Sequence, residues 1–123
     1  MVDEIENSIR NLEKVGDGAF SAAIVFGRDF TGFKGHFPGR PVLPGVCQIL
    51  ALSVLAGKAL KRNLRLTEVS RAKFLSVVEP DEETSFGFSL SGNPDSIVLN
   101  GTVRVKDKGV VGKFKLVFGD GNG

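Results

Sequence analysis

The stretch GHFPGRPVLPGVCQIL, residues 35–50, contains the only histidine of the chain together with three prolines and three glycines. Proline fixes the backbone angle φ, and glycine allows conformations that other residues avoid. Directly after this stiff segment the sequence becomes apolar. The stretch therefore predicts a rigid loop that holds His36 in front of a buried helix.

That helix is predicted over Pro44–Arg62. Proline is favoured in the first turn of a helix, and Lys58 and Lys61 suit the negative C-terminal end. Asn63 is expected to cap this end. Apolar residues cover almost every side of the segment, which contains no Asp or Glu. A helix of this kind must be surrounded by the rest of its fold.

The remaining segments predict one short helix and several strands. Helical spacing of apolar residues predicts an N-terminal helix that ends at Gly16 and Gly18; these residues are Val2, Ile5, Ile9 and Leu12. Ala19–Gly27 is rich in β-branched and aromatic residues, which predicts a first strand, and a loop follows over 28–43. Four later runs predict further strands, separated by the turn sequences EPDEE, GNPD and KDKG: Leu64–Val78, 84–92, 96–105 and 110–118.

This order of elements predicts an α+β fold, in which one antiparallel sheet curls around one buried helix. A chain of 123 residues has room for one such domain. We expect the domain to cover residues 1–118 and residues 119–123 to form a flexible tail.

Composition restricts the function classes. The net charge is +2, and the basic residues are scattered, so we expect no nucleic-acid interface. One cysteine excludes an internal disulfide and fits a reducing compartment. The N-terminus is acidic and polar, unlike a signal peptide, and the uncharged run Pro41–Gly57 is short for a membrane span. We expect a cytoplasmic protein without a membrane partner. One His and one Cys cannot build a zinc site, so we expect no metal, and no nucleotide motif indicates a cofactor.

Two motifs carry a resemblance to a known family. His36–Val46 match H-F-P-G-x-P-V-x-P-G-V, which resembles the active-site signature of 3-hydroxyacyl-[acyl carrier protein] dehydratases with the hot-dog fold. Lys73–Glu82 are similar to the family pattern K-F-x-x-P-V-x-P-G-D, with Val77 and Asp81 in place of a proline and a glycine. The continuation Val46–Ile49 looks closer to dehydratase-like proteins of aryl-polyene and related lipid clusters. The resemblance implies dimers joined through edge strands, with the acyl chain bound between two helices.

Dehydration of a 3-hydroxyacyl thioester requires a base, a proton donor for the departing hydroxyl and a donor to the thioester oxygen. An imidazole titrates near neutral pH, and the resemblance implies that His36 is the base. It also implies that the backbone N–H of Gly45 binds the thioester oxygen at the helix N-terminus. Val46, Phe37 and Gln48 are expected to contact the substrate, a thioester of acyl carrier protein or coenzyme A.

The family's acid does not carry over, because Leu50 stands where these dehydratases have Glu or Asp. Three interpretations remain open. The protein is a dehydratase whose acid comes from a water held by Gln48 or from another subunit. Alternatively, it is a non-catalytic or half-site subunit that contributes His36 to a heteromer with a paralogue. The third is an acyl-thioester binding module or a thioesterase of the same fold.

Weaker candidates have a simpler interpretation beside the functional one. Cys47 near the helix N-terminus is a candidate reactive thiol, but on an apolar helix it is more often a small core residue. Four cations are candidate contacts for an acidic carrier protein or a phosphate, or else solvated surface residues: Lys34, Arg40, Arg71 and Lys73. Phe37, Phe74 and Phe88 are candidate lining of an acyl tunnel.

Overall fold

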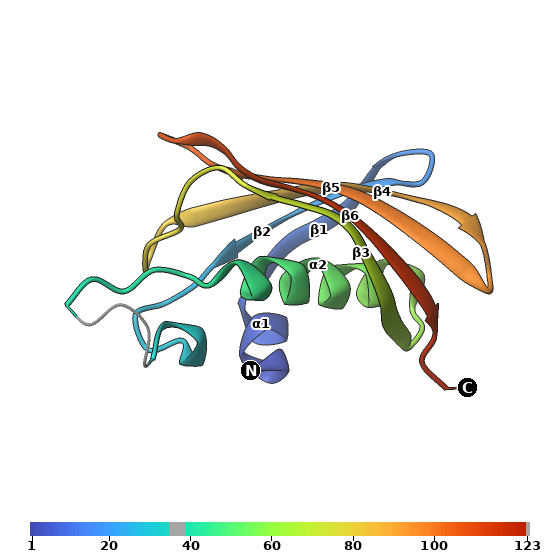
Figure 1. Cartoon of the computed structure of the whole chain (residues 1–123), viewed down its shortest axis with the longest axis horizontal. Helices are drawn as coiled ribbons and strands as arrows, with labels where there is room; N and C mark the ends of the chain where they lie inside the picture. Colours follow the sequence, from blue (N-terminus) through green and yellow to red (C-terminus); the bar gives the residue numbers. More distant parts are fainter. Residues whose placement is uncertain (35–38, 123) are drawn as a thin grey trace.

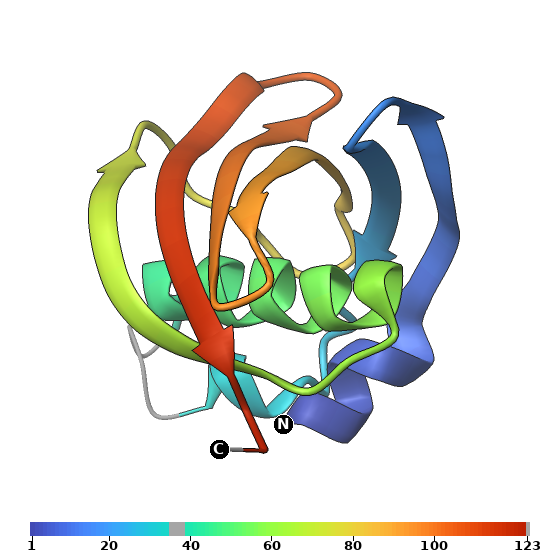
Figure 2. The same ribbon diagram turned by 90° about the vertical axis from the view of Figure 1, so that its right-hand side faces the viewer.

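The structure, a computed structural model, describes residues 1–34 and 39–122. Six strands form one antiparallel sheet in the order β1-β2-β4-β5-β6-β3, and it curves around the long helix α2 (Figures 1 and 2). The elements in chain order are α1 (Val2–Ser8), β1 (Ile9–Gly16), β2 (Ala19–Val25), the 3-10 turn η1 (Thr31–Phe33), α2 (Gly45–Leu60), β3 (Leu64–Phe74), β4 (Glu83–Asn93), β5 (Ser96–Val105) and β6 (Gly109–Asp120). The predicted α+β architecture is confirmed.

The core lies between α2 and the inner face of the sheet. Buried and exposed residues alternate along β4 and β5, as expected for strands with one face covered. Phe86 and Phe88 on β4 and Leu99 and Val103 on β5 point inward and are buried. One side of α2 packs against them; its buried residues are Cys47, Gln48, Ala51, Leu52, Leu55 and Ala56. The other side of α2 is only partly covered, and Val46 at its start is 67% exposed.

The predicted N-terminal helix is too long. It ends at Ser8, and the following residues form β1, which pairs with β2. A bulge lies between Arg10 and Glu13, where Asn11 has a φ of 54°. The extra residue shifts the alternation by one, so Ile9 and Leu12 both pack on the core although they are three apart. A bulged strand thus reproduced the spacing of a helix.

The ends of α2 differ from the prediction, which placed the helix over Pro44–Arg62 with Asn63 as its cap. Pro44 is the N-cap, and the helix runs over Gly45–Leu60. Its C-cap is Lys61 in the left-handed conformation, and the backbone N–H of Arg62 donates to the carbonyl of Gly57 (3.2 Å). The expected cap by Asn63 is therefore wrong. The C-terminal carbonyls are already satisfied by backbone donors, as in helices that end in a left-handed residue.

The structure also corrects two strand ends. The strand predicted to reach Val78 ends at Phe74, because Leu75 and Ser76 both donate to the single carbonyl of Val111 (2.9 and 3.4 Å) and the ladder stops. The last strand, predicted to end at residue 118, runs to Asp120 as β6. Two further bonds hold the next residues: the N–H of Gly121 donates to the Asn63 carbonyl (2.9 Å), and the Asn63 amide donates to Asn122 Oδ1 (3.0 Å).

Candidate functional site

The N-terminal end of α2 offers free backbone donors. Pro44 is in an extended conformation (φ −58°, ψ 143°), and the chain turns into the helix at Gly45. The first N–H groups of a helix have no acceptor within it, and the helix dipole makes this end positive. The first turn of α2 contains no acidic residue that would neutralise it. Gly45 and Val46 therefore present donors to any group that carries negative charge.

A cavity of about 620 Å³ opens at this helix end. It lies between the first turns of α2 and the last residues of β3, and its walls are mostly apolar. Gly45, Val46 and Gln48 line it from the helix, and Phe74 lines it from β3. The structure thus brings three residues predicted to contact the substrate to one cavity. An apolar chamber beside backbone donors fits an acyl group attached to a polar carbonyl.

Phe74 closes one side of this cavity against the helix. Its ring lies so near Gly45 that a Cβ added there would come within 2.6 Å of Phe74 Cζ. The same ring packs edge-on against Phe114 of β6, with 5.5 Å between the ring centres. Phe74 is 53% exposed, although it lies on the inner face of its strand. Glycine at position 45 therefore leaves room for this ring, which would have to move if a Cβ were added.

Gln48 carries the one buried side-chain oxygen without a hydrogen-bond partner in the part of the chain that the structure describes. The residue is 2% exposed. Its Oε1 occupies the space left by Gly112 of β6, where any added Cβ would overlap the oxygen and approach Phe114 Cε2 at 2.8 Å. Sequence reasoning did not identify Gly112. The available signal was an isolated glycine inside a strand, which often marks a close approach of two groups.

The loop that precedes α2 is fixed on both sides of residues 35–38. The N–H of Thr31 in η1 donates to Glu4 Oε2 (3.1 Å), and hydrogen bonds from Thr31 hold the pKa of this carboxyl below its ordinary value. After the gap, the N–H of Leu43 donates to the Val78 carbonyl (2.8 Å). His36 and Phe37 lie outside the described residues, so their predicted roles remain predictions.

An ionic network supports the segment around the hydrogen bond between Leu43 and Val78. Arg40 binds Glu79 (3.2 Å), and Lys108 binds Glu82 (2.9 Å) and the Val77 carbonyl (2.8 Å). Glu82 also accepts the N–H of Glu79 (2.7 Å). Burial works to raise the pKa of Glu82, but the Lys108 ammonium and the Glu79 N–H overcome it and leave the pKa below its ordinary value. The network joins the β5–β6 turn to the segment after β3.

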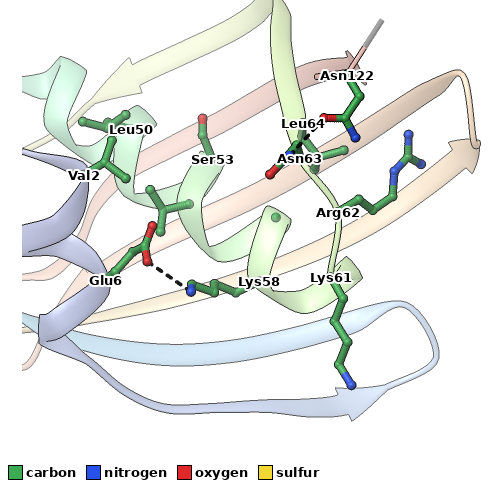
Figure 3. A pocket seen from close by; sticks show the side chains of 12 residues that line it. Val2, Glu6, Leu50, Ser53, Lys58, Lys61, Arg62, Asn63, Leu64 and Asn122 are labelled. Atoms are coloured by element: carbon green, nitrogen blue, oxygen red, sulfur yellow. Dashed lines mark hydrogen bonds and ion pairs between the residues drawn. The ribbon is translucent and has the colours of Figure 1, made fainter.

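Leu50 faces a different cavity of about 650 Å³, along the partly covered side of α2 (Figure 3). Ser53 and Lys58 line it from the same helix, and Val2 and Glu6 line it from α1. Glu6 is the only acidic residue in this lining, and Lys58 Nζ binds it at 3.1 Å. Within one chain, the structure therefore separates the family's acid position from the cavity of Gly45 and Gln48.

The structure separates the weaker candidates into core residues and residues on the outer face of the sheet. Cys47 is 2% exposed, and burial raises the pKa of its thiol, which fits a core residue rather than a reactive one. Phe88 is also a core residue, stacked on Phe20 with 5.5 Å between ring centres. Arg71 and Lys73 lie on the outer face of the sheet, directly opposite Lys115 and Lys113 of β6.

Within residues 1–34 and 39–122, no three His, Cys, Asp or Glu side chains come together in a way that could hold a metal ion. None of the helices in the same ranges has the length and hydropathy of a membrane span.

Comparisons with solved structures identify the fold. The dehydratase heterocomplex ApeI:P from Xenorhabdus doucetiae is similar with a TM-score of 0.74 at 18% identity, covering 90% of this chain and 96% of that chain. A putative thioesterase from Lactococcus lactis is similar with a TM-score of 0.75 at 15% identity, covering 97% and 94%. At such identities the likeness shows the fold alone. The predicted hot-dog fold is confirmed.

Comparisons of sequence identify the family. The chain is 44% identical over 57 residues to 3-hydroxyacyl-[acyl-carrier-protein] dehydratase FabZ of Novosphingobium aromaticivorans. This alignment covers 39% of this chain and 36% of that protein. The FabZ of Coxiella burnetii is 41% identical over 61 residues, 42% of this chain and 43% of its own length. The matched region thus spans less than half of these curated relatives. Residues 12–108, most of the chain, match the ApeI-like family, described as ApeI dehydratase. The chain belongs to the ApeI-like dehydratase family.

Proposed function

We propose that this protein is the histidine-bearing half of a hydro-lyase that dehydrates 3-hydroxyacyl thioesters and takes its acid from another subunit. The observation that carries the proposal is the environment of Leu50. This position faces a cavity whose only acidic lining residue, Glu6, is bound by Lys58. The chain thus combines the family's histidine motif with a helix that contains no Asp or Glu.

In the proposed reaction His36 removes the proton from C2 of the substrate. The electron pair forms the C2–C3 double bond, the C3–O bond breaks, and the hydroxyl leaves as water after it receives a proton from the acid. Negative charge develops on the thioester oxygen, which accepts a hydrogen bond from the N–H of Gly45 at the positive end of α2. General acid help contributes typically 10²–10⁴-fold, so this protein needs an acid from elsewhere.

The edge strand β3 supports a partner subunit. Every residue after Leu64 in this strand is exposed, including the apolar residues Leu66 and Val69 on the inner face. An exposed edge of this length is a template for pairing with another chain. Pairing through β3 would make a dimer or a multiple of dimers and bring a second α2 toward the cavity of Leu50. A dehydratase heterocomplex with a similar fold supports a paralogue as this partner.

The curated relatives, which are dehydratases of 3-hydroxyacyl-[acyl-carrier-protein], support a proposal for the substrate class. We propose an acyl group carried by acyl carrier protein or coenzyme A, as an intermediate of fatty-acid or related lipid synthesis. The single, buried and free Cys47 fits a protein of the cytoplasm.

The test follows enoyl-thioester absorbance with the protein alone and mixed with a paralogous hot-dog subunit that carries the helix acid. Turnover is expected in the mixture, and His36→Ala in the mixture should abolish it without lowering the thermal melting temperature. Unchanged turnover with His36→Ala would contradict the proposal. Release of free thiol without enoyl formation would instead support the thioesterase alternative.

A further inference from the structure

The amide of Gln48 is unusual for a core group. It is the fourth residue of α2, it is 2% exposed, and its Oε1 has no hydrogen-bond partner among the described residues. Buried side-chain polar atoms in folded proteins are nearly always hydrogen-bonded, and an exception needs an explanation. A buried amide oxygen without a partner among residues 1–34 and 39–122 is free to accept a hydrogen bond from another molecule.

The fold holds this amide in place. On β6, Gly112 leaves the space that Oε1 occupies, and a side chain at that position would displace it. The ring of Phe114 borders the same space. Two distant segments of the chain thus combine to keep a polar atom in an apolar wall. An aliphatic residue at 48 would fill this space without leaving a polar atom unsatisfied.

Gln48 also lines the cavity at the N-terminus of α2, together with Gly45. The two residues are three positions apart, a rise of about 4.5 Å along the helix. A thioester carbonyl bound at Gly45 carries, in the proposed substrate, a hydroxyl two carbons further along the acyl chain. Both residues border one cavity within a single helical turn, so a short acyl thioester bound there can reach both.

We propose that Gln48 hydrogen-bonds the 3-hydroxyl group of the acyl chain and makes this cavity selective for 3-hydroxyacyl over saturated acyl thioesters. A hydroxyl both donates and accepts, so it satisfies either polar end of the amide. Sites built to bond a substrate hydroxyl reject analogues that lack it, because the buried polar group is then left unpaired. This inference rests on the proposed function of the cavity as a site for acyl thioesters.

Calorimetry with two non-hydrolysable pantetheine amides, 3-hydroxybutanoyl and butanoyl, tests the inference in the presence of the paralogous subunit. The wild type should bind the hydroxylated ligand at least tenfold more tightly. Gln48→Leu should remove this preference while its affinity for the butanoyl ligand stays within about twofold. Its melting temperature should not fall, because an apolar side chain of similar size replaces an unsatisfied polar one. Ser53→Ala, on the other side of α2, is the matched control and should keep the preference.

Three results would overturn the inference. If Gln48→Leu keeps the preference for the hydroxylated ligand, the thioester site is intact but Gln48 does not produce the preference. If Gln48→Leu loses affinity for both ligands equally, Gln48 only maintains the shape of the cavity. Failure of the wild type to bind either ligand would overturn the proposed function as well. If Gln48→Leu does not fold, Gly112→Ala serves instead, because its methyl group displaces Oε1, and it should abolish the same preference.

Discussion

The ring of Phe74 at the end of β3 lies directly against Gly45 at the start of α2, in a space that a methyl group on Gly45 would fill. This contact joins the edge strand to the helix end that supplies the proposed oxyanion donor. It also explains why a half-exposed aromatic side chain lies beside the cavity rather than in the core.

The contact predicts an interaction energy between positions 45 and 74. Gly45→Ala should lower the free energy of unfolding more in the wild type than in a Phe74→Ala background. The difference should be about 1 kcal/mol, the scale found for residues in contact. Urea denaturation of the single and double variants gives this difference. Gly87→Ala is the control, since an added Cβ there meets no atom within 4 Å, and it should be additive with Phe74→Ala. Additive effects at position 45 would show that the ring moves away freely.

A second prediction concerns the pH dependence of the Lys108–Glu82 pair. The folded-state pKa of Glu82 is lowered, so the unfolded chain binds this proton first as the pH falls. The pair therefore stabilises the fold at neutral pH, and this contribution is lost as the pH falls below the ordinary value of 4.5. Glu82→Gln should lower the free energy of unfolding by about 1–2 kcal/mol near pH 7.

The stabilities of this variant and the wild type should converge as the pH falls through the lowered pKa of Glu82, because both then carry a neutral side chain at position 82. Urea denaturation at several pH values measures the two curves. Glu83→Gln, at the exposed neighbouring position, is the control and should change stability by less than about 0.5 kcal/mol. Parallel curves for Glu82→Gln and the wild type would contradict the assigned pair.

The edge strand gives a third prediction, on assembly. Light scattering at micromolar concentration should give a dimer or a multiple of dimers. Val69→Lys places a charge on the inner face of β3, where Val69 is 45% exposed in the single chain. It should weaken assembly at least tenfold while the secondary structure remains. Val15→Lys on the opposite edge strand β1, where Val15 is 60% exposed, should leave assembly unchanged. A monomeric wild type, or dissociation by Val15→Lys instead, would exclude pairing through β3.

Local signals in the sequence predicted most of the fold. Helix α2 and strands β4, β5 and β6 have clear periodicity and turn residues at their ends, and the structure places them within a few residues of the prediction. The boundary between α1 and β1 was missed because the bulge at Asn11 gave a strand the spacing of a helix. The order of the strands within the sheet was not predicted, because pairing between distant segments leaves little trace in any one of them.

The site was predictable only in part. The family resemblance of the proline-rich segment implied roles for Gly45, Val46 and Gln48, and the structure gathers these residues at one cavity. Leu50 lies apart from Gln48 for a simple reason: two residues along a helix correspond to about 200° of rotation, so they face opposite sides. The space for Gln48 could not be foreseen. It depends on the register of β6 against β5, which places Gly112 opposite Val103 and above the helix.

The last prediction restores the missing acid. Leu50 is half-buried and faces the cavity with Ser53 and Lys58 instead of the dry core, so a carboxyl there keeps contact with solvent. Leu50→Glu should therefore fold, with a melting temperature close to that of the wild type. Partial burial works to raise the pKa of the new carboxyl and keeps part of it protonated, as proton donation requires. The positive charge of Lys58 works to lower this pKa, but less strongly than a free ammonium would, because Lys58 is already bound to Glu6.

With this change the protein alone should gain dehydratase activity of about 10²-fold, the low end of general acid catalysis. Enoyl-thioester absorbance measures the gain, and Leu50→Gln is the matched control because it has similar size and polarity but no acidic proton. The gain should disappear when Leu50→Glu is combined with His36→Ala, because base and acid act on the same substrate. A folded, dimeric Leu50→Glu variant without any gain would mean that the cavity has been adapted for binding. In that case the dehydratase proposal should be abandoned for the protein acting with copies of itself.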